Sequence, residues 1–142
     1  MSERLLPPDA YLADTSTTKG RGVFAARDFA EGEIVEIAPA LVLAQGRRGL
    51  SLELRRRTFA WGRLLGVDDG SEAIVWGYGS LYNHDNPANM SYSPRAADGC
   101  MVFRAVRPIH KDTELTINYN TLGGGPVSDD DNWFERHEVE PI

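Results

Sequence analysis

Two short polar segments hold the side chains of this chain that could do chemistry. Residues 83–89 (NHDNPAN) gather amide and imidazole groups around a proline, in a stretch too irregular for a helix or a regular strand. An asparagine side chain both donates and accepts hydrogen bonds, so Asn83 could hold a polar ligand and a neighbouring strand together. Residues 114–119 (ELTINY) form a short β-type run that ends on Tyr119, which places a phenolic hydroxyl at the end of a strand.

A third segment, residues 20–25 (GRGVFA), formally matches the dinucleotide-binding pattern Gly-x-Gly-x-x-Gly/Ala. That pattern needs a strand before it and a helix after it, so that the pyrophosphate meets the helix N-terminus. Here the polar residues 15–19 precede the glycines, and Gly32 interrupts the stretch where the helix would have to lie. A dinucleotide site is therefore not expected, and the simplest interpretation is a glycine-rich turn between strands.

Other familiar catalytic and metal patterns are absent from the sequence. Residues 77–82 (GYGSLY) do not form the Gly-x-Ser-x-Gly elbow of a hydrolase, because leucine and tyrosine follow Ser80. The chain contains one cysteine, Cys100, and three scattered histidines, which exclude an internal disulfide and a structural zinc site. We therefore expect no bound metal.

Length and composition place the chain among globular proteins. Its 142 residues suffice for one domain with a buried core, and its 42% hydrophobic content is ordinary. The sequence lacks both an apolar run of the roughly 20 residues that a membrane span needs and a signal-peptide core at its start. We expect a soluble intracellular protein. The net charge of −6 argues against a nucleic-acid binder and would suit a lysine-rich protein partner.

Short apolar runs separated by turn residues predict a mostly β fold. We expect strands over residues 22–26, 34–43, 73–76, 91–93, 101–106 and 115–119. Residues 50–65 are the best candidate for a helix, although their apolar spacing is imperfect. Residues 1–16 are expected to form an N-terminal arm that includes an early short strand. Residues 123–131 are glycine- and aspartate-rich and predict a flexible connection to an acidic tail.

The order and spacing of the three segments resemble the signature of SET-domain protein lysine methyltransferases. The Gly-x-Gly pair, an Asn-His pair with a second asparagine six residues later, and a Glu-Leu-Thr-x-x-Tyr strand all occur between residues 17 and 119. The family commonly has Ser-Cys where this chain has Asp85 and Asn86, and its proline directly precedes the second asparagine, whereas Pro87 lies one residue earlier. The family's usual aspartate before the tyrosine is Asn118 here. Many members also carry cysteine-rich zinc-binding flanks, which this sequence lacks.

The resemblance implies the SET fold, with small sheets around a knot-like core and one short helical insert, as a single domain over residues 1–142. It also implies S-adenosylmethionine as the cofactor, with residues 121–142 as a tail that caps the cofactor site. The residues that the family pattern places at the cofactor are Lys19, Gly20, Arg21, Gly22, Tyr82, Asn83, His84, Tyr119 and one of Trp133 and Phe134. Tyr119 is the expected catalytic residue beside the transferring methyl group, and Tyr78 and Ile117 are expected in the substrate channel.

The activity implied is direct transfer of a methyl group to a lysine amine of a protein. A free lysine, with a pKa of about 10.4, must first lose its proton, and a narrow aromatic channel favours that loss by removing water. Two other functions stay open: a non-catalytic SET-like module that binds a protein or methylated lysine, and an enzyme acting on a small-molecule amine. The expected partner is a lysine-containing protein, with a basic, histone-like protein as one candidate. We expect a cytoplasmic location, or a nucleoid or nuclear one for a chromatin substrate. A homodimer that completes the substrate groove stays open.

Overall fold

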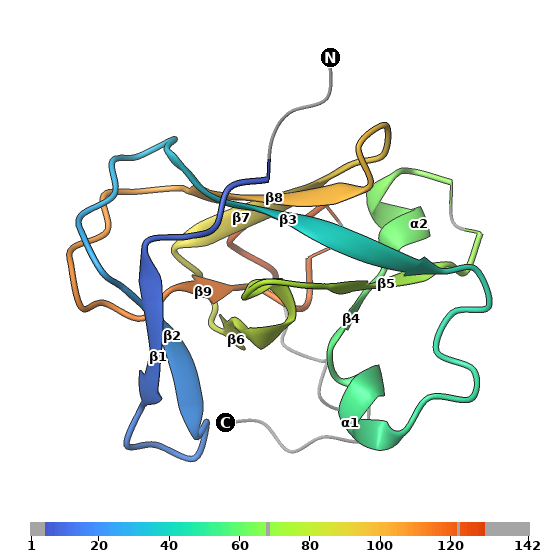
Figure 1. Cartoon of the computed structure of the whole chain (residues 1–142), viewed down its shortest axis with the longest axis horizontal. Helices are drawn as coiled ribbons and strands as arrows, with labels where there is room; N and C mark the ends of the chain where they lie inside the picture. The colour runs from blue at the N-terminus through green and yellow to red at the C-terminus, as the bar shows by residue number, and fades with distance from the viewer. Residues whose placement is uncertain (1–4, 68, 122, 130–142) are drawn as a thin grey trace.

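Short strands dominate the computed structural model, which describes residues 5–67, 69–121 and 123–129 (Figure 1). The strands are β1 (Ala10–Asp14), β2 (Arg21–Ala25), β3 (Ile34–Leu43), β4 (Thr58–Phe59), β5 (Glu72–Val75), β6 (Asn83–His84), β7 (Met90–Arg95), β8 (Cys100–Ala105) and β9 (Thr116–Ile117). The helical turns are α1 (Leu52–Arg55), α2 (Trp61–Leu64) and the 3-10 turn η1 (Gly79–Leu81). The mostly β fold predicted from the apolar runs is confirmed.

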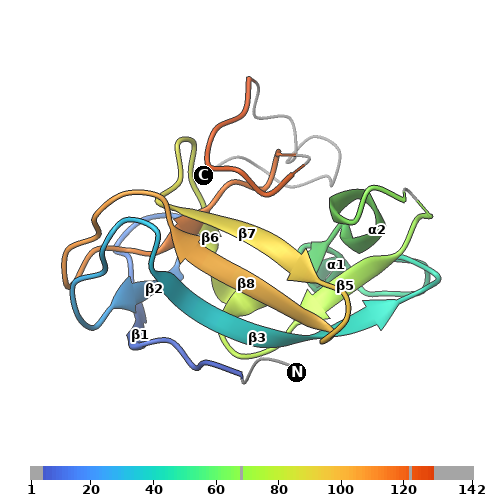
Figure 2. The same cartoon turned by 90° about the horizontal axis from the view of Figure 1, so that it is seen from above.

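Five strands form one antiparallel sheet in the order β4-β5-β3-β8-β7, which Figure 2 shows from above. Side chains alternate between the faces of β8, as the two-residue period of a strand requires. Met101 and Phe103 enter the main core on one face, and Val102 joins a small cluster with Ile37 on the other. Burial on both faces explains the apolar run of β8 and of the first half of β3, whereas Leu41 and Val42 near the end of β3 are exposed.

Aromatic side chains fill the main core beneath this sheet. The Phe103 ring lies 4.9 Å from the ring of Tyr82, 6.1 Å from that of Phe59 and 6.2 Å from that of Tyr92, measured between centroids. Tilted and edge-on ring pairs of this kind are favourable beyond the area they bury. Tyr82 directly precedes β6, so the core fixes the start of the polar segment identified in the sequence.

The single helix expected over residues 50–65 is wrong. The segment divides into α1 and α2, with the two-residue strand β4 between them. Thr58 and Phe59 pair with Ile74 and Ala73 on β5, and Phe59 is buried in the aromatic core. A short helix with imperfect periodicity has little stability of its own, so strand pairing and burial of Phe59 outweigh it.

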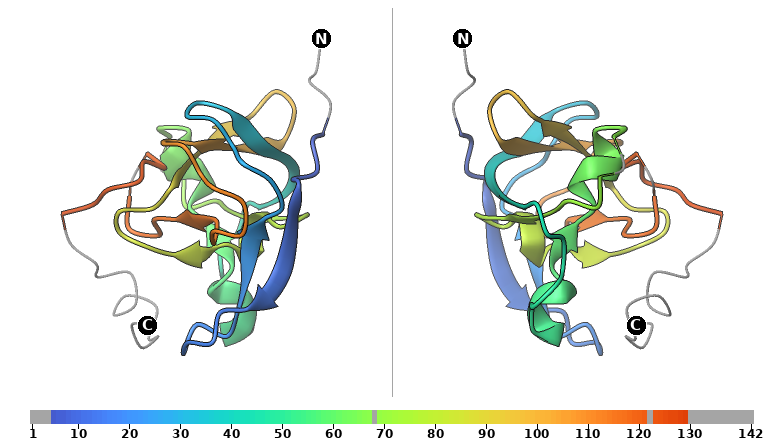
Figure 3. Two further views of the ribbon diagram at one scale, coloured as in Figure 1. Left: turned by 90° about the vertical axis from the view of Figure 1, so that its left-hand side faces the viewer. Right: turned by 90° about the vertical axis from the view of Figure 1, so that its right-hand side faces the viewer.

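The N-terminal segment belongs to the fold more fully than an arm would. β1 pairs along its whole length with β2 to form a hairpin, and Leu6 forms a further bridge to Ile37. In Figure 1 the hairpin lies at the left of the molecule and α1 at the lower right, and the end views of Figure 3 show both below β3 and β8. β6 and β9 lie between them.

The two polar segments meet as the parallel pair β6–β9, in which Asn83 pairs with Thr116 and His84 with Ile117. The Asn89 side chain clamps the same strands, because its Oδ1 accepts from Thr116 N at 2.9 Å and its Nδ2 donates to the carbonyl oxygen of Glu114 at 2.8 Å. Residues 83–89 thus lie between the strand ending at Tyr119 and the segment after that tyrosine. This arrangement is the knot-like core that the resemblance implied.

The described part of the glycine-rich segment after Tyr119 packs against β7 and Ala88. Its composition predicts a flexible connection instead. The carbonyl oxygen of Gly124 accepts from Tyr92 N, and that of Pro126 accepts from Ala88 N, both at 2.9 Å. Gly124 has a φ of +81°, and an added Cβ would lie 1.8 Å from the Tyr92 carbonyl oxygen. Glycine is needed here for close approach of the main chain to β7.

Candidate active site

A polar cluster joins the glycine turn to the two polar segments. The Asn83 side chain donates from Nδ2 to the carbonyl oxygen of Arg21 at 3.0 Å and to Glu114 Oε2 at 2.8 Å. Lys19 Nζ lies 3.9 Å from Glu114 Oε1. Gly22 is buried against this group, and a Cβ there would lie 2.4 Å from Glu114 Oε2. The absence of a side chain at Gly22 therefore lets the carboxylate approach the turn.

The imidazole of His84 anchors the strand end that carries Tyr119. Its Nδ1 accepts a hydrogen bond from the backbone N–H of Tyr119 at 3.0 Å, which makes Nδ1 the unprotonated nitrogen when the ring is neutral. The two rings also lie 5.2 Å apart between centroids. His84 therefore positions Tyr119 in two ways: its imidazole accepts a hydrogen bond from the Tyr119 backbone, and the two rings lie close together.

The Tyr119 hydroxyl points back toward the first polar segment. It donates to the backbone carbonyl oxygen of Tyr82 at 2.5 Å. The residue as a whole is half-buried, but burial around the hydroxyl raises the pKa of the phenol well above its usual range, against a smaller lowering effect of the Arg57 charge. The phenol therefore stays protonated at neutral pH and remains a hydrogen-bond donor.

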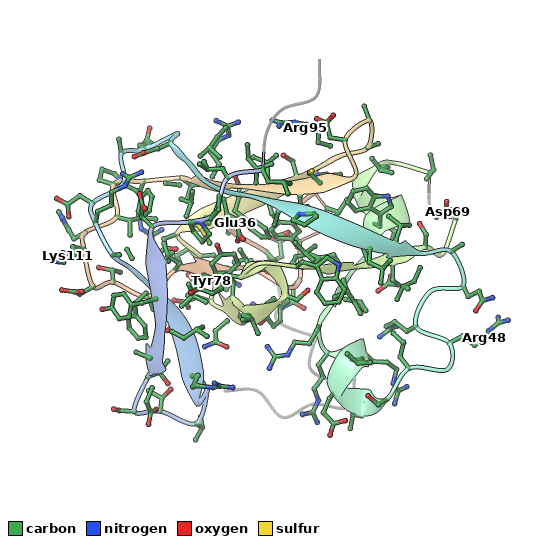
Figure 4. The ribbon with its side chains drawn as sticks, viewed as in Figure 1. Glu36, Arg48, Asp69, Tyr78, Arg95 and Lys111 are labelled. Carbon is green, nitrogen blue, oxygen red and sulfur yellow. The ribbon has the colours of Figure 1, made fainter. Side chains whose placement is uncertain are left out.

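A buried carboxylate fixes the position of Tyr82, whose carbonyl oxygen binds the Tyr119 hydroxyl. Glu36 on β3 is 1% exposed, and it accepts from the Tyr82 hydroxyl at 2.6 Å and from Tyr78 N at 3.0 Å. Burial raises the pKa of the Glu36 carboxyl, although both hydrogen bonds favour its charged form. Burial and the nearby Glu36 likewise raise the pKa of the Tyr82 phenol well above its ordinary value. Figure 4 shows Glu36 and Tyr78 in the centre of the molecule.

A pocket of about 180 Å³ opens beside Tyr119. Its buried side is aromatic and aliphatic and is formed by Phe59, Tyr82, Tyr92, Ile117 and Tyr119. Its more exposed side is formed mainly by charged residues, namely Arg47, Arg56, Arg57, Arg63 and Glu72. The pocket is mainly aromatic and aliphatic at Tyr119 and basic where it opens, and its apolar side would remove water from a side chain entering it.

The structure brings most of the sequence-predicted residues together. Tyr82 and Tyr119 line the pocket, while the polar cluster of Lys19, the glycine turn and Asn83 lies outside its lining. Tyr119 therefore lies at the boundary between the cluster and the pocket. Ile117 lines the pocket as expected of a channel residue, whereas Tyr78 does not and instead binds Glu36 through its main chain. Trp133 and Phe134 lie outside the described residues.

Sequence reasoning missed the side-chain roles of Glu36, Glu114 and the pocket arginines. The role of Glu36 could have been predicted from the sequence, because a carboxylate between Val35 and Ile37 in a buried apolar strand needs hydrogen-bond partners. Glu114 lay within a recognised motif, but its pairing with Asn83 depends on two distant segments meeting. Among the described residues, no group of three or more His, Cys, Asp or Glu side chains could hold a metal ion. The same part of the chain includes no helix long and apolar enough to cross a membrane.

Comparisons with known proteins agree on one family. The SET domain model matches residues 20–120. A histone-lysine N-methyltransferase of Schizosaccharomyces pombe, specific for histone H3 lysine-37, is 28% identical over 120 residues, covering 82% of this chain and 71% of that protein.

Solved structures show the same likeness at lower identity. A Plasmodium falciparum protein described as a histone methyltransferase has a TM-score of 0.63 at 24% identity, and the match covers 81% of this chain and 96% of that one. The Polycomb Repressive Complex 2 of Chaetomium thermophilum, in an autoinhibited conformation bound to S-adenosylmethionine, has a TM-score of 0.61 at 19% identity; the match covers 81% of this chain but 15% of that one. At these identities the structural likeness establishes the fold.

Proposed function

Because this chain belongs to the SET-domain family, as its three motifs predicted, we propose that it is a protein lysine N-methyltransferase that uses S-adenosylmethionine. The cofactor supplies an electrophilic methyl group on a sulfonium centre. The observation that carries the proposal is the position of Tyr119, whose buried hydroxyl lies between the polar cluster and the pocket. A residue in that place can contact both a cofactor on one side and an amine entering from the other.

The polar cluster fits the methionine end of this cofactor, which carries an ammonium and a carboxylate. Glu114 and the carbonyl oxygen of Arg21 are acceptors suited to an ammonium group, and Lys19 is a cation suited to a carboxylate. Asn83 holds the two acceptors in place. At Gly20 an added Cβ would meet nothing within 4 Å, so a ligand can approach the main chain there, whereas the absence of a side chain at Gly22 makes room for Glu114. We assign Lys19, Gly20, Arg21, Gly22, Asn83 and His84 to the cofactor site.

The chain's own contribution to the reaction is to orient and desolvate the amine. The apolar side of the pocket, with Ile117 and Tyr92, would strip water from a lysine ammonium and favour loss of its proton to solvent. The Tyr119 hydroxyl and the Tyr82 carbonyl oxygen are two polar groups at this end of the pocket that could orient the amine. Alignment of the amine with the methyl group, rather than acid–base chemistry by a side chain, would lower the barrier.

The test is methyl transfer by the Tyr119→Phe variant. The substitution removes one hydroxyl and little volume, so the fold and cofactor affinity should persist. Loss of an oriented polar group at a reacting centre costs about a hundredfold in rate or more, and we expect that loss in single-turnover transfer from labelled S-adenosylmethionine to a lysine-rich protein.

Tyr11→Phe is the matched control, since Tyr11 lies in the β1–β2 hairpin, outside the pocket lining, and its hydroxyl donates to Asp112. Equal rates for the Tyr119→Phe variant and the parent would refute the role of Tyr119. Cofactor binding without transfer to any protein lysine, but with transfer to a free amine, would favour a small-molecule substrate. Binding of a methylated lysine without any transfer would favour a non-catalytic module.

A further inference from the structure

Positive charge is concentrated in one segment of an otherwise acidic chain. Residues 47–63 hold six of the 15 Lys and Arg residues but one of the 21 Asp and Glu residues. The segment carries α1, β4 and α2, which lie together at one side of the molecule in Figure 1. Since the fold places this segment beside Tyr119, its charge bears on the substrate.

Four arginines of this segment line the exposed side of the pocket: Arg47, Arg56, Arg57 and Arg63. Glu72 is the acidic residue among the lining residues, and four guanidinium groups against one carboxylate leave a formal surplus of three positive charges. Glu72 is already engaged, because its Oε1 accepts from Thr58 Oγ1 at 2.9 Å and lies 3.8 Å from Arg47 Nε. The carboxylate therefore offsets one of the four arginines.

The position of Arg57 is fixed by the fold. Its Nη1 donates to the carbonyl oxygen of Ser80 at 3.3 Å, and the Ser80 hydroxyl donates to the Arg57 carbonyl oxygen at 2.8 Å. Its charge also reaches Tyr119, since it lowers the pKa of that phenol against the larger effect of burial. The basic side of the pocket is thus electrically coupled to its buried end.

A basic peptide segment would be repelled at this opening, and like charges brought together across an interface oppose binding. Carboxylates flanking the target lysine would instead pair with the arginines. We propose that the substrate of this protein is a lysine flanked by acidic residues, recognised by Arg56, Arg57 and Arg63 at the pocket mouth. This inference rests on the proposed function, and it differs from the basic, histone-like partner expected from the family resemblance.

The extent of the basic surface favours a short acidic peptide over a nucleic acid. Outside residues 47–63 the part of the chain that the structure describes holds seven basic and 13 acidic residues. A long polyanion leaving the pocket would meet this acidic remainder, whereas nucleic-acid binders normally present an extended basic face. Three arginines line one pocket, so their charges are available to residues on either side of a lysine that enters it.

The experiment uses the full chain and synthetic peptides with one central lysine, blocked at both ends. The two residues on each side of the lysine are glutamate, glutamine or arginine. Two quantities are measured: kcat/KM by mass spectrometry with S-adenosylmethionine, and peptide affinity by fluorescence anisotropy with the demethylated cofactor present. We expect the glutamate peptide to exceed the glutamine peptide by about tenfold in both, because several partly exposed ion pairs each contribute a few-fold. The arginine peptide should be the weakest.

Charge reversal supplies the decisive comparison. The double variant Arg56→Glu with Arg63→Glu should invert the order of the peptides, with thermal unfolding used to confirm that it is folded. Arg48→Glu is the matched control, since Arg48 is adjacent to Arg47 in sequence but lies outside the pocket lining and at the periphery in Figure 4. It should keep the glutamate preference.

Failure of this inference and failure of the proposed function give different results. Methylation of the arginine peptide as fast as the glutamate peptide, or an unchanged order in the double variant, would overturn the inference and leave the methyltransferase intact. Arginine-dependent binding of the glutamate peptide without methylation of any peptide would support the inference and refute the activity. Displacement of the glutamate peptide by a single-stranded oligonucleotide of similar length would assign the basic surface to nucleic acid and overturn the inference.

Discussion

The Tyr119 hydroxyl donates to the backbone carbonyl oxygen of Tyr82, and the Tyr82 hydroxyl donates in turn to the buried carboxylate of Glu36. Residues from three distant parts of the chain are therefore linked by two short hydrogen bonds. The link orients the phenol of Tyr119 toward the end of the pocket. Because burial raises the pKa of that phenol well above its usual range, a rise in transfer rate with pH would come from the substrate amine and not from Tyr119.

Replacing Glu36 by glutamine should change how stability depends on pH. Burial raises the folded-state pKa of Glu36 above its ordinary value of 4.5. As pH rises from below this ordinary value, the unfolded chain loses the proton first, so the parent loses stability until pH passes the folded-state pKa. The free energy of unfolding of the parent, relative to Glu36→Gln, should therefore fall with rising pH over this window and then level off.

Urea denaturation at a series of pH values measures this difference. The exposed residue Glu31 supplies the control, and the variant Glu31→Gln should follow the parent across the same range. A constant difference between the parent and Glu36→Gln would show that the Glu36 carboxyl does not carry a raised pKa. The glutamine amide can keep both partners, with its Oε1 accepting from Tyr78 N and its Nε2 donating to the Tyr82 hydroxyl oxygen, so we expect the variant to match the protonated parent closely in stability at low pH.

Asn83→Ala should weaken cofactor binding while Asn86→Ala should not. Asn83 holds the carbonyl oxygen of Arg21 and the Glu114 carboxylate together, and loss of a hydrogen bond to a charged group costs about 1.5 to 3 kcal/mol. That cost corresponds to roughly a tenfold to hundredfold loss of affinity by calorimetry. Asn86 binds Ser128 instead, so its loss should lower the melting temperature without changing affinity. Equal affinities for the two variants would remove Asn83 from the cofactor site.

Gly22→Ala should displace Glu114 from the glycine turn. The added Cβ would lie 2.4 Å from Glu114 Oε2 and 2.9 Å from Thr15 Cγ2, so both of these side chains must move, and the carboxylate must move further. Crowding of a well-packed site costs about 1 to 3 kcal/mol, and the displaced carboxylate should also reduce cofactor affinity. Gly123→Ala is the control, because an added Cβ there meets nothing within 4 Å. Unchanged cofactor affinity in Gly22→Ala would show that the turn and Glu114 do not act together.

Removal of the tail should have effects that depend on where the chain is cut. Pro126 and Ser128 hydrogen bond to residues 86, 88 and 118, so a chain ending at Gly125 loses part of the packed core around β6 and should be destabilised. A chain ending at Asp129 keeps these contacts and should have a higher melting temperature than the chain ending at Gly125. If Trp133 or Phe134 covers the adenine, the chain ending at Asp129 should bind the cofactor several-fold more weakly than the full chain. Loss of about 1 kcal/mol of stacking has an effect of that size. Full affinity in the chain ending at Asp129 would refute a capping role for Trp133 and Phe134.

Local features of the sequence determined the strand pattern and the family. The apolar run over residues 34–43 forms the strand β3 with the bounds expected, and its first half is buried between two hydrophobic clusters. The motif spacing around Asn83 and Tyr119 identified the SET fold, because short segments with fixed offsets carry that information without tertiary contacts.

The long-range contacts of those segments depended on the tertiary structure. The helix expected over residues 50–65 gave way to two turns and β4, since pairing with β5 and burial of Phe59 are long-range effects that local periodicity does not contain. The glycine-rich segment around Gly124 is packed down for the same reason, through hydrogen bonds to a strand some thirty residues earlier. The links from Asn83 to Glu114 and from Tyr82 to Glu36, and the arrangement of arginines around one pocket, likewise join residues far apart in sequence. Residue types and spacing set which chemistry is available, but only the folded chain sets the distances and burial on which that chemistry depends.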